Sequence, residues 1–199
     1  THEYIQTGHL DSKFGFDLTQ IDDALELLRD EYENLNVIGL HAHIGSQIFE
    51  TKIYYDEVEV ILKEIARIRE KFGIELHTIN LGGGLGIKYT ENDQPPTVEE
   101  IARQITTSVE ENSKKYNTGD ITIFIEPGRS IIGTSGVTLY TVGSSKQVPK
   151  GRKYVAVDGG MADNPRPSLY QALYTAQVAN KPEAPLAQTI TLAGRFCES

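Results

Sequence analysis

The sequence predicts an α/β protein whose first two thirds alternate between helices and short apolar strands. Three segments have the apolar spacing of an amphipathic helix, and each is followed by an apolar run of strand length. Polar and glycine residues gather just beyond each apolar run, where parallel α/β folds build their sites. Strands this apolar are typical of a parallel sheet covered on both faces. A (β/α) barrel and an open sheet both satisfy this pattern.

The first helix is expected after Thr19, a potential N-cap, because Ile21, Ala24, Leu25 and Leu28 recur at helical spacing. Residues 35–43 then predict a buried strand that ends at the sequence Ile44-Gly45-Ser46.

The second helix is expected over residues 55–72, where Gly73 provides a left-handed C-terminal cap. Residues 76–81 predict the next strand. The sequence Thr97-Val98-Glu99-Glu100 forms a capping box that opens the third helix. Residues 121–126 predict a third apolar strand.

The pattern changes after Arg129, where short strands at 137–142, 154–157 and 189–192 are separated by turn residues. One or two helical turns are expected within residues 168–179. We therefore expect residues 1–131 to form part of a (β/α) domain and residues 132–199 to form part of a β-rich, sandwich- or barrel-like domain.

Composition excludes several classes of protein. The 199 residues carry a formal charge of -9, which argues against a nucleic-acid-binding surface. A single cysteine rules out an internal disulfide and indicates a reducing, cytoplasmic compartment. No apolar run approaches the roughly 20 residues of a membrane span, and no signal peptide pattern is present. The chain begins with Thr1 and stops just after a strand-like run, so we expect an internal fragment.

The glycine-rich stretch Leu81-Gly82-Gly83-Gly84-Leu85-Gly86 follows the second strand and is the most distinctive motif. Successive backbone N–H groups without side chains can form a concave anion site. The stretch matches neither the Walker A loop nor the dinucleotide fingerprint. We interpret it as a phosphate cradle, and the alternative is a tight turn without a ligand.

His41 and His43 share one face of the first strand. Zinc binding is an alternative for this pair, although His77 begins its strand and lies roughly 13 Å below the rim at ~3.3 Å per residue. His41 is expected to be an interior histidine, whereas His43 could stack on a flat cofactor ring. Ser46 could donate its hydroxyl to a phosphate or simply serve the turn.

Glu126 ends the third strand, three residues before Arg129. The pair could form a salt bridge at a turn, or Glu126 could face a cationic heterocycle and stabilise its protonated form. Arg166 and Tyr170 form a weaker pattern suited to a carboxylate. Cys197 follows an apolar run and, by itself, indicates only a core thiol.

Together these segments resemble the pyridoxal-phosphate decarboxylases of the alanine racemase and ornithine decarboxylase fold group, and within it the diaminopimelate decarboxylase branch. The resemblance covers nearly the whole chain, from Tyr4-Ile-Gln-Thr-Gly8 and Ser12-Lys-Phe-Gly15 onward. The other matching motifs are His43-Ile-Gly-Ser46, Gly82-Gly-Gly-Leu-Gly86, Glu126-Pro-Gly-Arg129, Asp158-Gly-Gly-Met161, Arg166-Pro-Ser-Leu-Tyr170 and Cys197-Glu-Ser199.

The resemblance implies the C-terminal part of a (β/α)8 barrel followed by part of a β domain, with pyridoxal 5'-phosphate as cofactor. It implies that His43 stacks on the cofactor ring and Glu126 pairs with the pyridine nitrogen. The residues that would hold the phosphate are Ser46, Gly82, Gly83, Gly84, Gly128 and Arg129.

The resemblance also implies decarboxylation of meso-2,6-diaminopimelate to L-lysine, with Cys197 as proton donor. Arg129, Arg166 and Tyr170 would take the distal carboxylate of this amino-acid substrate, and Glu198 its distal ammonium. In this group Cys197 and Glu198 would serve the neighbouring subunit, which implies a homodimer.

One feature departs from the family pattern. The family's Schiff-base lysine lies in an early barrel strand, in a Tyr-x-x-Lys-Ala-Asn-like context that no lysine here has. We therefore expect the 199-residue chain to be inactive alone. The alternatives are an arginine, ornithine or carboxynorspermidine decarboxylase, a racemase, or a non-catalytic protein that binds pyridoxal phosphate.

Overall fold

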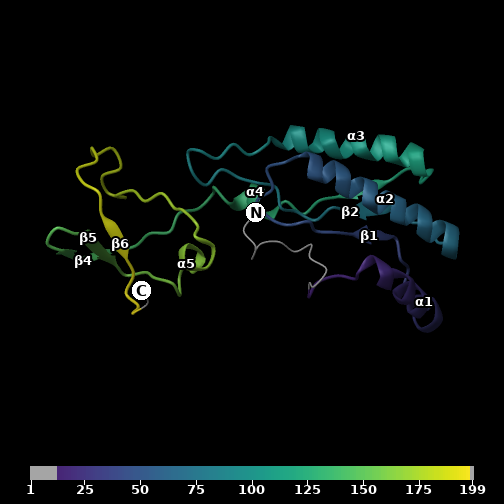
Figure 1. Ribbon diagram of the computed structural model, residues 1–199, viewed down its shortest axis with the longest axis horizontal. Helices are drawn as coiled ribbons and strands as arrows, with labels where there is room; N and C mark the ends of the chain where they lie inside the picture. The colour runs from purple at the N-terminus through teal and green to yellow at the C-terminus, as the bar shows by residue number, and fades with distance from the viewer. Residues whose placement is uncertain (1–12, 198–199) are drawn as a thin grey trace. The chain divides into compact units, whose positions relative to one another are not determined.

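The computed structural model of the protein describes residues 13–197, which divide into two compact units. The first unit contains the residues up to Lys88 together with Gln94–Thr134. The second contains Tyr89–Asp93 and the residues from Ser135 onward. Each unit has its own three-stranded sheet (Figure 1).

The sheet of the first unit consists of β1 (Gly39–His41), β2 (Thr78–Asn80) and β3 (Thr122–Phe124). Both pairs of strands are parallel, with β2 in the centre. The predicted alternation of helices with parallel strands is therefore confirmed. Because the three strands are in register, their carboxyl ends form one rim, and the loops that leave this rim are neighbours.

The ladders are shorter than the predicted strands, because each covers only three residues. The central row of the sheet, Leu40, Ile79 and Ile123, belongs to the hydrophobic core, and Ile79 is fully buried. The expectation of a sheet covered on both faces is wrong for the described residues. His41 and Phe124 are exposed because they point to the face opposite the core.

Three helices supply most of the rest of this core: α1 (Ile21–Glu31), α2 (Lys52–Phe72) and α3 (Val98–Tyr116). α2 begins three residues before the predicted start and ends at Phe72 as predicted. Gly73 caps it with a φ of 69°. The side chains that form its buried stripe are Val58, Ile61, Leu62, Ile65 and Ile68.

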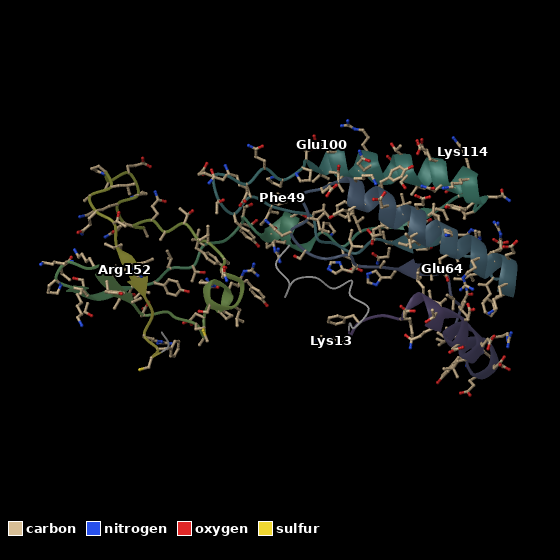
Figure 2. All side chains as sticks on the ribbon, in the orientation of Figure 1. Lys13, Phe49, Glu64, Glu100, Lys114 and Arg152 are labelled. Carbon is tan, nitrogen blue, oxygen red and sulfur yellow. The ribbon has the colours of Figure 1, made fainter. Side chains whose placement is uncertain are left out.

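The predicted capping box of α3 is confirmed. Glu100 N–H donates to Thr97 Oγ1 at 3.2 Å, and Thr97 N–H donates to Glu100 Oε2 at 2.8 Å. Figure 2 shows Glu100 and Lys114 at opposite ends of α3. A negative charge in the first turn and a positive charge in the last turn both interact favourably with the helix dipole. The predicted cap of α1 is wrong: Asp17 caps a preceding 3-10 turn (η2, Leu18–Gln20) by accepting a hydrogen bond from Thr19 N–H.

The second unit is built around β5 (Lys153–Val157). β4 (Val142–Gln147) pairs with β5 antiparallel, and β6 (Thr191–Ala193) pairs with it parallel. The expected strand at 137–142 is displaced to β4, because Val142 and the turn-like residues after it make the ladder with β5. The expected helical turns are present only as α5 (Arg166–Tyr170).

The chain between the sheets contains one further short helix, α4 (Gly128–Ile132), directly after β3. Among residues 13–197, no helix has both the length and the apolar character that crossing a membrane requires.

A buried carboxyl group gives this fold a testable pH dependence. Glu57 of α2 is 6% exposed, and neither of its carboxyl oxygens has a hydrogen-bond partner among the described residues. Burial raises the pKa of Glu57 from 4.5 to about 8. Between these pH values the folded protein keeps a proton that the unfolded chain releases, so stability falls as the pH rises.

We expect Glu57→Gln to raise the free energy of unfolding at pH 8 by on the order of 2 kcal/mol and to flatten its decline between pH 5 and 8, since a neutral amide needs no proton. Urea unfolding across this pH range measures both effects. Glu70→Gln, an exposed position on the same helix, serves as the control and should leave the slope unchanged. Parallel pH profiles for Glu57→Gln and the unmodified protein would contradict the prediction.

Candidate functional site

The loops that follow the three parallel strands enclose a cavity of about 200 Å³ at the carboxyl rim of the sheet. All of its lining residues come from these loops and from the start of α4. They are His43, Ser46, Gly83, Gly84, Leu85, Glu126, Pro127, Gly128, Arg129 and Ser130. The structure thus brings together every residue predicted to bind the cofactor except Gly82, which is buried and does not line the cavity.

The glycine loop is held tightly between its two neighbours. Gly82 and Gly84 have φ values of 60° and 85°, which residues other than glycine rarely adopt. At Gly83 the reason is steric, because a β-carbon there would lie 2.3 Å from the carbonyl oxygen of Glu126. The backbone of the loop is therefore a tightly packed turn. It also borders the cavity.

The amide groups of the loop differ in their availability to a ligand. Gly82 N–H donates to Asn80 Oδ1 at 2.9 Å, and Gly83 N–H donates to His43 Nδ1 at 3.2 Å. Gly84 N–H has no hydrogen-bond partner among the described residues, and Gly84 lines the cavity. Of these three amides, that of Gly84 is the one open to an incoming anion.

Glu126 lies on the opposite side of the glycine loop from His43 and is held by side chains from the other two strands. Asn80 Nδ2 donates to Glu126 Oε1 at 2.8 Å, and His41 Nε2 lies 3.7 Å from the same oxygen. The side chain of His41 is 54% exposed, so its predicted interior position is wrong. It points to the sheet face that no described residue covers.

Sequence reasoning missed two polar side chains at this rim. Asn80 ends β2 and contacts both Glu126 and the amide of Gly82. Gln47 follows Ser46 and contacts Ile87 and Arg129. The signal in the sequence is a polar residue at the end of a strand for Asn80 and in the loop after a strand for Gln47. Their partners lie on other loops, so the spacing of residues does not predict these contacts.

The second unit carries the remaining predicted site residues. Arg166 and Tyr170 lie one turn apart on α5, and the guanidinium carbon of Arg166 is 5.3 Å from the centre of the Tyr170 ring. The ring of Tyr89 lies 5.9 Å from the same carbon. Two aromatic rings therefore lie close to this guanidinium group, and cation–π contacts with them restrict its orientation.

Cys197 is a free, exposed thiol at the end of the segment that follows β6. This segment is tied to the predicted motif at 158–161, since Arg195 N–H donates to Gly159 O at 3.1 Å. A β-carbon on Gly160 would lie 2.5 Å from the Phe196 ring, so Gly160 lets that ring pack closely. Glu198, together with the matching motifs at residues 4–8 and Ser12, lies outside the described residues.

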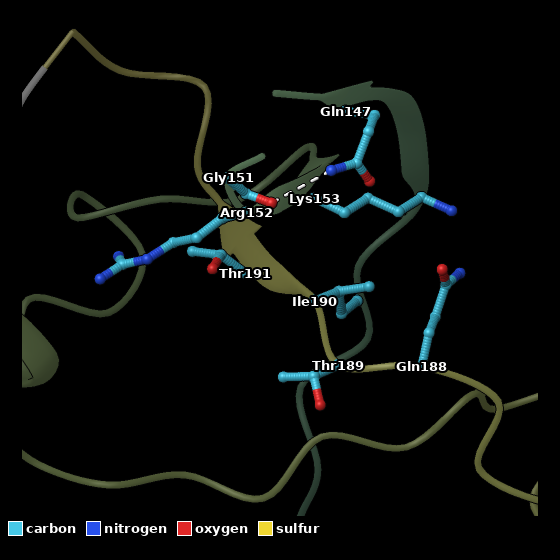
Figure 3. Close-up of a pocket in the computed structure, with 8 residues that line it drawn as sticks. All are labelled: Gln147, Gly151, Arg152, Lys153, Gln188, Thr189, Ile190 and Thr191. Carbon is cyan, nitrogen blue, oxygen red and sulfur yellow. Dashed lines mark hydrogen bonds between the residues drawn. The ribbon is translucent and has the colours of Figure 1, made fainter. Parts of the chain in front are cut away.

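A larger cavity of about 350 Å³ lies in the second unit (Figure 3). Its residues are Gln147, Gly151, Arg152, Lys153, Gln188, Thr189, Ile190 and Thr191. The Gln147 amide is occupied by a hydrogen bond to Gly151 O, and the charged ends of Arg152 and Lys153 point away from each other. None of the predicted site residues lines it, so the smaller cavity is the candidate site.

The zinc alternative lacks a complete ligand set in the part of the chain that the structure describes. Within residues 13–197, no three His, Cys, Asp or Glu side chains are grouped so that they could hold a metal ion. The groups that do converge on the rim are the Gly84 amide, the hydroxyls of Ser46 and Ser130, one guanidinium, one imidazole and one carboxylate. This set suits a phosphate ester attached to a cationic ring.

Comparison with known proteins agrees with this donor set. The family described as "Pyridoxal-dependent decarboxylase, pyridoxal binding domain" matches residues 1–133. The diaminopimelate decarboxylase of Bacillus subtilis is 48% identical over the whole chain. The crystal structures of diaminopimelate decarboxylase from Helicobacter pylori and M. jannaschii, both with L-lysine, are 32% and 33% identical, with TM-scores of 0.80 and 0.82.

These matches cover 100% of this chain but 46% of the B. subtilis protein, 46% of the H. pylori chain and 45% of the M. jannaschii chain. The chain thus spans a little under half the length of the relatives that it resembles.

The packing of the glycine loop can be tested with a matched pair of substitutions. We expect Gly83→Ala to lower the free energy of unfolding by about 1–3 kcal/mol, because the new methyl group overlaps the Glu126 carbonyl. Gly128→Ala should change it by less than about 0.5 kcal/mol, because nothing lies within 4 Å of a β-carbon there. Chemical denaturation of both variants measures the difference, and equal losses would contradict the steric explanation.

Proposed function

We propose a function on the premise that the chain belongs to the pyridoxal-dependent decarboxylases, whose pyridoxal-binding domain matches residues 1–133. The proposed reaction of the whole protein is the decarboxylation of meso-2,6-diaminopimelate to L-lysine and carbon dioxide, the last step of lysine biosynthesis. The observation that carries the proposal is the cavity at the strand rim, where His43, Ser46, Glu126 and Arg129 meet. The relatives named diaminopimelate decarboxylase support the choice of substrate.

The lining of the cavity fits pyridoxal 5'-phosphate. In the proposed complex Ser46, the Gly82–Gly84 loop and Gly128 with Arg129 hold the phosphate. Gly84 offers the amide that has no other partner, whereas Gly82 and Gly83 shape the loop. The imidazole of His43 stacks on the ring. When bound, the cofactor accepts the electron pair that the breaking carbon–carbon bond leaves behind.

Glu126 is proposed to keep the ring nitrogen protonated through the attraction between opposite charges. Its carboxylate is already oriented, since Asn80 donates a hydrogen bond to one oxygen at 2.8 Å. The other oxygen has no hydrogen-bond partner among residues 13–197 and is the one proposed for the ring nitrogen. A protonated ring withdraws electrons more strongly, so orientation of Glu126 contributes directly to the reaction rate.

The substrate's distal end is assigned to the second unit. Arg166 and Tyr170 are proposed to bind the distal carboxylate together with Arg129, and Glu198 is proposed to bind the distal ammonium. Cys197 is proposed to donate the proton that replaces the lost carboxylate. We further propose a homodimer in which Cys197 and Glu198 serve the partner's site, in a cytoplasmic enzyme.

For the architecture, we propose that residues 1–131 are the C-terminal part of a (β/α)8 barrel and that residues 132–199 are part of a C-terminal β domain. Two features support the barrel. The helices of the first unit pack on one face of its parallel sheet, and His41, Thr122 and Phe124 on the other face are exposed. Among the described residues, β1 and β3 also have no strand on their outer edges.

The role of Arg166 predicts a selective kinetic defect in the whole protein. We expect Arg166→Ala to raise KM for diaminopimelate about 10–100-fold, because a charge-assisted hydrogen bond to the distal carboxylate is lost. Steady-state release of carbon dioxide measures this. Arg152→Ala, an exposed arginine of the same unit, is the control. An unchanged KM for Arg166→Ala would exclude the assigned role.

The 199-residue chain by itself should not release carbon dioxide from diaminopimelate. None of its lysines has the sequence context of the family's Schiff-base lysine, so the cofactor has no covalent anchor. A radiometric carbon dioxide assay on the purified chain, with the whole protein as positive control, tests this. Turnover by the chain would overturn the proposed assignment of the lysine. Cofactor binding by the whole protein without turnover would favour a non-catalytic binding protein.

A further inference from the structure

Gln47 occupies an unusual backbone position beside the cavity. It follows Ser46 in the loop after β1 and has a φ of 59°, although it is not a glycine. Residues other than glycine rarely adopt this left-handed backbone conformation. Where they do, contacts with the surrounding structure usually enforce it. Its side chain is half-buried and is not part of the cavity lining.

The carboxamide of Gln47 joins the three loops that enclose the cavity. Its Nε2 donates to Ile87 O at 2.6 Å, and its Oε1 accepts from Ile87 N–H at 3.3 Å. The same Oε1 accepts from Arg129 Nη1 at 3.4 Å. One side chain thus connects the loop after β1 with the end of the glycine loop and with the arginine that follows β3.

Backbone contacts strengthen the same junction. Ile48 N–H donates to Gly84 O at 2.9 Å, and Gly86 N–H donates to Ile48 O at 3.1 Å. On the far side, the Ile87 side chain packs against the end of α4, where a β-carbon on Gly133 would lie 2.5 Å from Ile87 Cδ1. Gly84 and Arg129, the two groups best placed to meet an anion, are therefore coupled through residues 47–48 and 86–87.

We propose that Gln47 is a positioning residue for phosphate recognition: its carboxamide holds the Arg129 guanidinium and the end of the glycine loop in the arrangement that receives the phosphate group. Gln47 does this without contacting the phosphate. The inference rests on the proposed function, because it assumes that the anion received at the cavity is the phosphate of the cofactor.

The test compares two ligands that differ only in the phosphate. Dissociation constants of the whole protein for pyridoxal 5'-phosphate and for pyridoxal are measured by absorbance titration. We expect Gln47→Ala to weaken binding of pyridoxal 5'-phosphate about tenfold and binding of pyridoxal less than about twofold, since only the phosphate contacts are disturbed. Equal weakening of both ligands, or no weakening of either, would overturn the proposal.

Two further variants separate the side chain from the backbone. Gln47→Gly accepts the left-handed backbone but lacks the carboxamide, so it should lose phosphate-dependent affinity to the same extent as Gln47→Ala. Gln171→Ala is the matched control, because Gln171 has a similar φ of 52°. It should leave the ratio of the two affinities unchanged. Full affinity in Gln47→Gly would show that backbone strain, and not the carboxamide, is responsible.

A second readout does not depend on the cofactor. Amide hydrogen exchange at Ile87 should be faster in Gln47→Ala than in the unmodified protein, because Ile87 N–H loses its acceptor. Inorganic phosphate should also raise the midpoint of thermal unfolding less in Gln47→Ala. If the unmodified whole protein binds neither pyridoxal ligand, the proposed function fails, and these two measurements still decide the role of Gln47. Unchanged exchange and an unchanged phosphate effect would refute it.

Discussion

The close approach of the glycine loop to its neighbours is the constraint on which the rest of the site depends. The loop passes so near the Glu126 carbonyl that no side chain fits at Gly83, and so near the loop after β1 that none fits at Gly82 or Gly84. This contact fixes the spacing between the three strand ends, and it leaves a small cavity in front of the loop. The parallel register of β1, β2 and β3 brings the loops to one rim, but the glycines determine how closely they meet.

Polar contacts divide the rim into two halves with different chemistry. On one side, Asn80 and His41 surround the Glu126 carboxylate. On the other, Gln47 supports the Arg129 guanidinium. A ligand with a cationic ring at one end and a phosphate at the other matches this arrangement. The contacts restrict the orientation of Glu126 and Arg129 without any ligand, so an anion or cation that these groups received would cost less side-chain entropy on binding.

The sequence predicted much of this fold for identifiable reasons. Apolar spacing located α2, and local capping signals located the start of α3 and the end of α2 at Gly73, because these features depend on neighbouring residues alone. The cap of α1 was predicted wrongly because Asp17 and Thr19 are both good capping residues, and only the local geometry decides between them. In the second unit, strand positions depend on partner strands, so the sequence does not give the position of β4.

For the site, the sequence by itself determined the chemical inventory: a glycine loop, two histidines, a carboxylate and an arginine, each at or just past the carboxyl end of a predicted strand. The tertiary structure decided how these groups are used. It assigned the amides of Gly82 and Gly83 to internal hydrogen bonds, exposed His41, and made Gln47 and Asn80 the links between loops. Contacts between residues about 40 positions apart depend on the register of the sheet, and no local pattern in the sequence encodes them.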